Sequence, residues 1–220
     1  MIQKEKINII QIEGLSKSFK KQEVIKNLNL TFNENDRIAL IGQNGAGKTT
    51  LIRCMLGQYN FEGKMEILNM NPRIDRKNIL QHIGFVPQMP PPLKLTVREL
   101  IYFFEKLTGT DANTFIRLSH EMGLSVEDNF SKPFFKLSGG MKQKLLISFA
   151  LGRKPRILLL DEPSANLDPQ ARKILFDHLK DFAPKTLMIL SSHRMDEIAG
   201  IVNRVIEMDL GVVVLDKNLN

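Results

Sequence analysis

The glycine-rich segment GQNGAGKTT, at residues 42–50, constrains the fold of this chain more than any other stretch. The apolar run at 38–41 before it predicts a buried strand, and the run at 51–56 after it predicts a helix ended by Gly57. Between a strand and a helix, the pattern G-x-x-x-x-G-K-[ST] is a phosphate cradle. Glycines let successive backbone N–H groups turn toward an anion, and the helix start adds its unpaired amides and positive dipole end. The segment therefore predicts an α/β protein that binds a phosphate chain.

Three side chains at the end of this segment have separate predicted tasks. Lys48 is expected to place its charge on the β- and γ-phosphates, and Thr49 to offer its hydroxyl to Mg²⁺. Thr50 is expected to bond a nearer phosphate. A glycine-rich turn with an incidental lysine is the alternative, and the flanking strand and helix argue against it.

Size and composition predict a single domain. The 220 residues, of which 43% are hydrophobic, are enough for one substantial core. No apolar run reaches transmembrane length, and the first residues lead straight into strand-like sequence, so we expect no signal peptide. Cys54 is the single cysteine and cannot form an internal disulfide. We expect it to be a small buried hydrophobe in a reducing cytosol.

The net charge of +7 fits either nucleic acid or the anionic leaflet of a membrane. The chain has no basic cluster with interleaved aromatic residues of the kind that binds nucleic acid. We therefore expect no nucleic-acid partner.

Hydrophobic patterning predicts strands and helices that alternate along the chain. Strands are expected at 7–15, 24–32, 62–68, 84–87, 157–160 and 186–190, with a closing hairpin at 204–208 and 211–216. Helices are expected at 51–56, 96–106, 111–122, 138–152, 170–181 and 195–201. The second of these helices begins with a predicted capping box, from Thr96 to Glu99. Residues 89–135 form a mostly helical insertion into an otherwise α/β pattern.

Two acids follow the apolar run 157–160, at the point where a buried strand is expected to end. The carboxyl ends of strands are where α/β sheets bind ligands. Asp161 is therefore a candidate for the Mg²⁺ shell, and Glu162 for orienting or deprotonating a water molecule. The alternative is a turn with two solvated acids, which the four apolar residues before them disfavour. His193 follows another predicted strand, and a lone histidine is more often structural than functional.

Two further segments are suited to a nucleotide. Phe19 is an aromatic residue in polar surroundings, and it either packs back onto the sheet or offers its ring to a flat ligand such as adenine. The sequence alone favours neither. Ser138, Gly139 and Gly140 open a predicted helix, whose amides make a second anion-ready surface. Helix capping explains the serine but not the two adjacent glycines.

In this order, the motifs resemble those of the ATP-binding-cassette (ABC) family, in particular the nucleotide-binding subunit of a transporter. The resemblance covers nearly the whole chain. Residues 42–50 match the Walker A loop, Gln88 the Q-loop, 137–140 the family signature, and 157–162 Walker B with its catalytic glutamate. The remaining matches are the D-loop at 164–168, the switch histidine at His193 and the adenine-stacking position at Phe19.

The resemblance implies an α/β fold, with a P-loop NTPase (RecA-like) core, an antiparallel β subdomain and an inserted α-helical subdomain. A single nucleotide-binding domain would span 1–220, with the catalytic core at 1–88 and 155–220 and the helical subdomain at about 89–154. It also implies an ATPase that powers transport through a separate membrane permease. The chain would form a head-to-tail dimer with an identical or paralogous ABC subunit, cytoplasmic and peripheral on the inner face of the cell membrane.

The resemblance also assigns the site residues, motif by motif. ATP would be held by Phe19, Gly42, Asn44, Gly45, Ala46, Gly47, Lys48, Thr49 and Thr50, and by Ser138, Gly139 and Gly140 of the second subunit. Mg²⁺ would be held by Thr49, Gln88 and Asp161. Glu162 would polarise the attacking water, His193 would hold the γ-phosphate, and Gln88 would link the site to the helical insertion. Asp168 would connect the two sites across the interface.

The chain departs from the family pattern in three places. Met141 replaces the glutamine that is commonest in the signature, and with Lys-Gln-Lys after it the segment loosely resembles the exporter-type branch. Residues 89–93 are unusually rich in proline for the stretch after the Q-loop. We expect no C-terminal regulatory domain of the kind that some importers carry.

The permease is expected to contact the groove between the Q-loop and the helical insertion. The apolar candidates there are Met89, Leu93, Phe103, Phe104, Phe134 and Phe135. Most of the phenylalanines are expected to belong to the core of the insertion, which leaves Met89 and Leu93 as the better contacts. Two other functions remain open at this point: a soluble ABC ATPase of cofactor assembly, and a nucleotide-gated interaction module with little hydrolysis.

Overall fold

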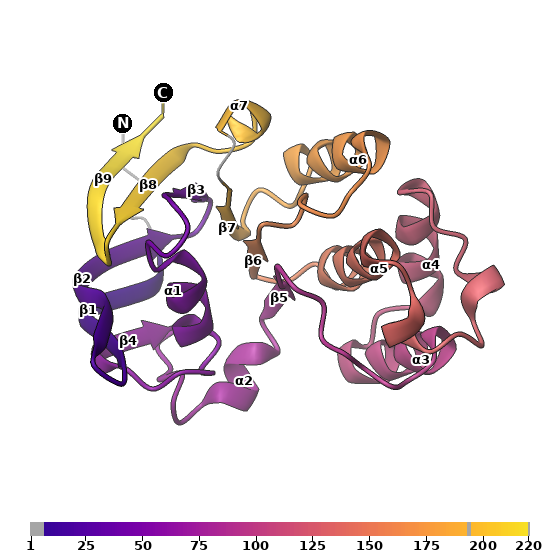
Figure 1. The fold of residues 1–220 in the computed structure, drawn as a ribbon, viewed down its shortest axis with the longest axis horizontal. Helices are drawn as coiled ribbons and strands as arrows, with labels where there is room; N and C mark the ends of the chain where they lie inside the picture. The colour runs from indigo at the N-terminus through magenta and orange to yellow at the C-terminus, as the bar shows by residue number, and fades with distance from the viewer. Residues whose placement is uncertain (1–6, 193–194, 220) are drawn as a thin grey trace.

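The computed structural model describes residues 7–192 and 195–219, which form two sheets and a set of helices (Figure 1). One sheet is antiparallel, with the order β2-β1-β4. The other has the order β5-β6-β7-β3-β8-β9, and its neighbours are parallel except for the β8–β9 pair. The strands are β1 Asn8–Phe19, β2 Gln22–Asn33, β3 Arg37–Ile41, β4 Glu62–Ile67, β5 Ile83–Val86, β6 Ile157–Asp161, β7 Leu187–Ser191, β8 Arg204–Asp209 and β9 Val212–Asn218.

The helices follow the predicted order with one addition, the short helix α2. They are α1 Lys48–Met55, α2 Arg76–Leu80, α3 Val97–Thr108, α4 Ala112–Glu121, α5 Gly139–Gly152, α6 Pro169–Lys180 and α7 Met195–Ile198, with 3₁₀ turns at Glu127–Asn129 and Phe134–Lys136. The predicted capping box is present at the start of α3, where Thr96 and Glu99 cap each other. Across the described ranges, no helix combines the length and the apolar character needed to cross a membrane.

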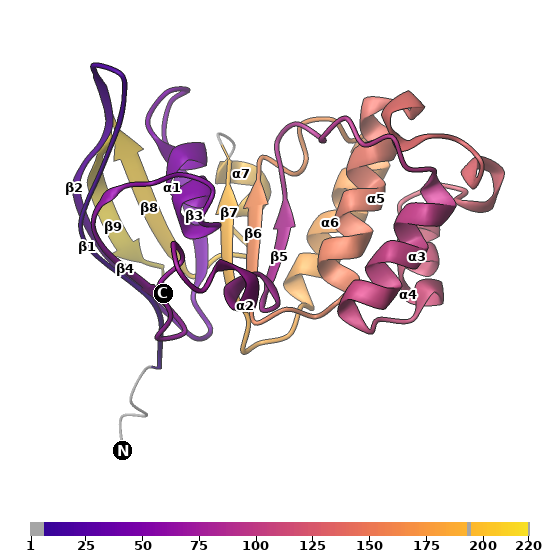
Figure 2. The same cartoon turned by 90° about the horizontal axis from the view of Figure 1, so that it is seen from below.

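Helix α1 packs between the two sheets (Figure 2), so the segment after the glycine-rich loop is surrounded by apolar side chains. Leu51 and Ile52 belong to the same buried cluster as Ile10 of β1 and Leu159 of β6. Cys54 is fully buried and unbridged there, as predicted. Burial raises the pKa of its thiol to about 11, which keeps it a neutral, apolar group.

Helices α3, α4 and α5 lie together at one end of the molecule (Figure 2) and share a separate aromatic core. The rings of Phe104 and Phe149 stack at 4.1 Å in this core, and Phe134 is fully buried. The expectation that most of the candidate phenylalanines are core residues is met by Phe104 and Phe134 only. Phe103 and Phe135 are 50% and 43% exposed, because they lie on the outer faces of α3 and of a 3₁₀ turn.

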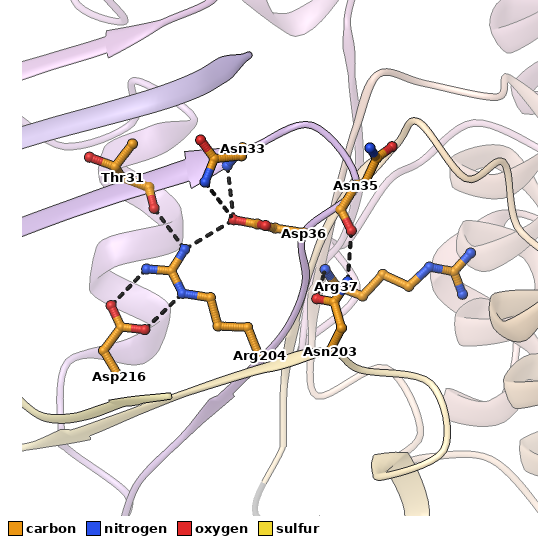
Figure 3. A network of polar contacts seen from close by, with 8 residues as sticks. All are labelled: Thr31, Asn33, Asn35, Asp36, Arg37, Asn203, Arg204 and Asp216. Atoms are coloured by element: carbon orange, nitrogen blue, oxygen red, sulfur yellow. Dashed lines mark hydrogen bonds and ion pairs between the residues drawn. The ribbon is translucent and has the colours of Figure 1, made fainter. Parts of the chain in front are cut away.

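A polar network ties β2, β8 and β9 together at the end of β3 that lies away from the glycine-rich loop (Figure 3). Arg204 of β8 forms two hydrogen bonds with the carboxylate of Asp216, at 2.7 and 2.6 Å. Its guanidinium also donates to Asp36 at 3.0 Å and to the carbonyl oxygen of Thr31 at 2.8 Å. Asp36 is only 6% exposed, so Arg204 is the cation that neutralises a buried carboxylate.

We expect Arg204→Met to lower the free energy of unfolding by about 3 kcal/mol, because it leaves the carboxylate of Asp36 buried without its cation. Urea unfolding of the variant measures the loss. Lys64→Met is the control, because it removes a cation from the exposed ion pair between Lys64 and Glu66 and should change stability little. Equal unfolding midpoints for the two variants would show that Arg204 does not neutralise Asp36.

Candidate functional site

The glycine-rich loop joins β3 to α1, as predicted, and its backbone shape requires glycine. Gly42 has a φ of 142°, and a Cβ at this position would lie 2.1 Å from the carbonyl oxygen of Met208. Gly47 caps the N-terminus of α1 with a φ of 108°. The side chain of Lys48 curls back over the loop, and its Nζ donates to the carbonyl oxygens of Gly42 at 2.6 Å and Gln43 at 3.0 Å. The loop is therefore held closed by its own lysine.

Lys48 is a buried cation, 7% exposed, close to two acids. Burial lowers the pKa of its ammonium group from the ordinary value, while the carboxylates of Glu162 and Asp161 act in the opposite direction. A phosphate chain in the loop would add negative charge and favour the charged form further.

The carboxylate of Asp161, at the end of β6, joins three elements of the site. Its Oδ1 accepts a hydrogen bond from Thr49 Oγ1 of α1 at 3.2 Å and from Ser191 Oγ of β7 at 2.7 Å. The Ser191 hydroxyl also accepts from the backbone N–H of Glu162 at 2.9 Å. Sequence reasoning missed Ser191, although it ends the strand beside β6 and is level with Asp161 in the sheet.

Glu162 has a left-handed backbone, with a φ of 48°, which is uncommon for a residue other than glycine. The bond to Ser191 and the buried Pro163 that follows hold it there. Strained backbone of this kind gathers at functional sites, where the surrounding structure fixes it. Glu162 therefore has a fixed backbone conformation at the carboxyl end of a core strand.

A cavity of about 280 Å³ brings most of the predicted residues together. Its lining consists of Val24, Asn44, Gly45, Ala46, Gly47, Lys48, Thr49, Thr50, Gln88 and Glu162. Gln88 reaches it from the exposed loop after β5, and β5 lies beside β6 in the sheet. Val24 of β2 is an addition that the sequence did not indicate. Backbone donors, one lysine and one carboxylate thus face the same space.

Six predicted residues of the described ranges do not line this cavity: Gly42 and Asp161, whose contacts are given above, and Phe19, Ser138, Gly139 and Gly140. Phe19 is 40% exposed and packs its ring edge-on against Tyr59 at 5.1 Å. Ser138 caps α5 by accepting from the N–H of Met141 at 3.2 Å, and the exposed helix tip continues with Gly139 and Gly140.

His193 is outside the described residues.

Asp168 has two partners within its own chain. It caps the N-terminus of α6 by accepting from the N–H of Ala171 at 2.8 Å, and its other oxygen pairs with Lys144 of α5 at 2.7 Å. The hydrogen bond from Lys144 is the main reason that the pKa of Asp168 lies below its ordinary value. The D-loop is therefore fixed to the signature helix inside one chain.

Residues 25–165 match the family model described as "ABC transporter". A tungstate uptake system ATP-binding protein, TupC of Peptoclostridium acidaminophilum, is 34% identical over 93% of this chain and 96% of its own length. An uncharacterised ABC transporter ATP-binding protein of Bacillus subtilis, YxlF, is 31% identical over 93% of this chain and 69% of its own length.

Two solved structures share the fold. The ATP-binding subunit of an ABC transporter superposes with a TM-score of 0.85 and 24% identity, over 96% of this chain and 90% of that one. A bacterial Atm1-family ABC exporter with ATP bound gives a TM-score of 0.83 and 21% identity, over 96% of this chain and 39% of that one. These matches confirm the predicted P-loop α/β fold.

Proposed function

The chain belongs to the ABC transporter family as an ATP-hydrolysing transport subunit, and we propose that it works as a head-to-tail dimer on a separate membrane permease. The observation that carries the proposal is the meeting of Lys48, Gln88 and Glu162 around one cavity beside the glycine-rich loop. A triphosphate anchored by the loop would place its γ-phosphate between a cation and a carboxylate. This is the arrangement that phosphoryl transfer to water requires.

The loop residues Gly42 and Asn44 to Thr50 would grip the phosphates through backbone N–H groups and the Lys48 ammonium. On binding, Nζ would exchange its bonds to the carbonyl oxygens of Gly42 and Gln43 for bonds to phosphate oxygens. Phe19 is the proposed platform for adenine; it is 40% exposed, and the ammonium group of Lys17 lies over its ring, 4.7 Å from the centroid.

The residues around Asp161 fit a magnesium ion. Thr49 and Asp161 bring a hydroxyl and a carboxylate oxygen to within 3.2 Å of each other, at the edge of the phosphate loop. Mg²⁺ prefers oxygen ligands and is often held by one or two carboxylates together with substrate phosphates. Gln88 lines the nucleotide cavity together with Thr49 and would supply a third oxygen. When bound, the ion would neutralise charge on the phosphates.

Hydrolysis would depend on Glu162, which would orient and polarise the attacking water. Ser191 holds the backbone N–H of Glu162 and the carboxylate of Asp161 through one hydroxyl, so the two acids keep a fixed relation. His193 is proposed to hold the γ-phosphate.

The tip of α5 supports the proposed dimer. Ser138 and Gly139 are exposed, and Gly140 is half-buried, so the first residues of the helix N-terminus are open to solvent. A helix N-terminus attracts anions through its unpaired amides. In a head-to-tail dimer this tip would meet the γ-phosphate held by the second subunit.

A groove of about 400 Å³ beside the Q-loop would receive the permease, with Met89 and Leu93 in its wall next to Phe85 and Phe104. Met89 is 76% exposed and therefore open to a partner. The subunit would lie on the cytoplasmic face of the membrane, with the catalytic core and the helical subdomain, about 89–154, on the two sides of the docked permease segment.

Purification of the tagged chain from detergent-solubilised membranes, together with an ATPase assay, tests this function. We expect a polytopic membrane protein to co-purify and ATP to be hydrolysed. Hydrolysis without a membrane partner would favour a soluble ATPase of cofactor assembly. ATP binding without hydrolysis would favour a nucleotide-gated interaction module.

We expect Met89→Asp to reduce recovery of the chain with membranes by about tenfold or more, because a carboxylate would be buried against an apolar partner. ATP hydrolysis by the isolated chain should not change, since Met89 does not line the nucleotide cavity. Leu210→Asp is the matched control, because Leu210 is 73% exposed on the β8–β9 turn. Equal membrane recovery of both variants would exclude Met89 from the docking surface.

A further inference from the structure

Gln143 is a fully buried polar residue on α5, in the Lys-Gln-Lys segment after the signature, and the family resemblance stated above assigns it no role. Its carboxamide nitrogen donates to the carbonyl oxygen of Pro163 at 3.2 Å and to that of Pro87 at 3.4 Å. Pro87 comes directly before Gln88, and Pro163 directly after Glu162. One amide group therefore joins the two chain segments that carry Gln88 and Glu162.

These two segments lie just beyond the paired part of their strands. Strands β5 and β6 are parallel neighbours, and their pairing ends at Val86 and Leu160. Prolines at 87 and 163 have no backbone N–H, so neither can donate a bond that would extend the ladder. The Gln143 amide takes the place of such a bond, and it does so from a third element.

Packing alone would not favour glutamine at position 143. Its Oε1 is buried without a hydrogen-bond partner in the part of the chain that the structure describes, which costs stability. Rotating the amide would turn this oxygen toward two carbonyl oxygens, so the orientation is fixed by its acceptors. The neighbouring positions Leu145 and Ile147 are apolar and fully buried, so an apolar residue would suit the surroundings of this helix.

Gln143 also lies one turn after the tip of α5, four residues beyond Gly139. Backbone hydrogen bonds join residues four apart in an α-helix, so a displacement of the tip displaces Gln143. We propose that Gln143 is a positioning residue for hydrolysis: it fixes the segments of Gln88 and Glu162 to α5, so that the tip's engagement with the second subunit's nucleotide sets their geometry. This inference rests on the proposed function of the site.

The variant Gln143→Met tests the proposal, because methionine keeps the length of the side chain and removes the donor. We expect kcat for ATP hydrolysis to fall by about 10–100-fold, the cost of a misplaced catalytic group. The ATP Kd should stay unchanged, because Gln143 does not line the nucleotide cavity. Gln143→Asn keeps the amide donor but shortens the side chain by one methylene, so it should give an intermediate kcat.

The matched control is Ser148→Ala on the same helix. Ser148 is fully buried, but its hydroxyl bonds Ser119 of α4 at 3.0 Å, away from the site. This control should lower the unfolding temperature and leave kcat near the wild-type value. The inference is overturned if Gln143→Met has the kcat of Ser148→Ala, or if its loss of activity appears in the ATP Kd.

Two results separate this inference from the proposed function. A wild-type chain that does not hydrolyse ATP would overturn the proposed function and the inference with it. An active wild-type chain with an unimpaired Gln143→Met variant would overturn the inference alone. If Gln143→Met fails to fold, the same comparison is made with Gln143→Asn, and an unreduced kcat in that variant overturns the inference.

Discussion

Replacing Glu162 by glutamine is expected to slow ATP hydrolysis by a factor of about 10²–10⁴, the usual contribution of a positioned general base. The amide keeps the volume of the side chain but cannot polarise or accept a proton from water. ATP binding should persist, because the loop and Lys48 are unchanged. Phosphate release under steady-state conditions measures the fall in the hydrolysis rate. Equilibrium ATP binding measures whether the affinity for ATP is retained.

The same variant should accumulate as an ATP-bound dimer. In the proposed cycle ATP closes the dimer and hydrolysis lets it reopen, so blocking the second step traps the closed state. Size-exclusion chromatography with saturating ATP and Mg²⁺ would detect it. Glu66→Gln, which neutralises an acid of an exposed ion pair on β4, is the control and should behave as wild type. Normal hydrolysis by Glu162→Gln, or a monomer at saturating ATP, would show that Glu162 does not activate the attacking water.

Much of the fold was predictable because its signals are local. The phosphate-loop pattern predicts a strand before it and a helix after it. Thr96 and Glu99 form the capping box that predicts the start of α3. Runs of apolar residues located the core strands. The first two strands extend further than predicted, to a tight turn at Lys20 and Lys21, because polar residues that face solvent weaken the apolar pattern without ending the strand.

The residues that sequence reasoning missed act over long separations. Ser191 bonds Asp161 from another strand, Gln143 bonds Pro87 and Pro163, and Arg204 bonds Asp36 at the far end of β3. A serine at a strand end or a glutamine within a helix has no local pattern that distinguishes it. The contacts of such a residue depend on which strands become neighbours, and parallel strands take their neighbours from distant parts of the chain.

The nucleotide cavity of one chain contains only part of the proposed ATP site. It has the phosphate loop, Gln88 and Glu162, while the tip of α5 that begins at Ser138 faces outward. Lys144 and Asp168 fix the D-loop to the same helix. The proposed second anion-binding surface is therefore tied to the D-loop within one chain, as the proposed head-to-tail dimer requires.

Ser138→Arg is expected to reduce ATP hydrolysis by a factor of at least about 10², the cost of losing donors that stabilise a transition state. An arginine at the exposed tip of α5 would keep the second subunit's γ-phosphate away from the helix amides. ATP should still bind to the loop of the variant itself, because Ser138 does not line that cavity. Ser131→Arg is the control, because it adds the same side chain at an exposed serine that lies outside the tip of α5 and does not line the nucleotide cavity, and it should leave hydrolysis near the wild-type rate.

Mixing two inactive variants tests whether the site is shared between chains. Lys48→Ala should lose ATP binding at its own loop, whereas Ser138→Arg should keep it. In a mixed dimer, the intact loop of the Ser138→Arg chain faces the intact α5 tip of the Lys48→Ala chain, so one complete site forms. Activity in the mixture above that of either variant alone is the expected result. If Ser138→Arg loses ATP binding and hydrolysis together, or the mixture stays inactive while mixed dimers are present, the two halves do not form one shared site.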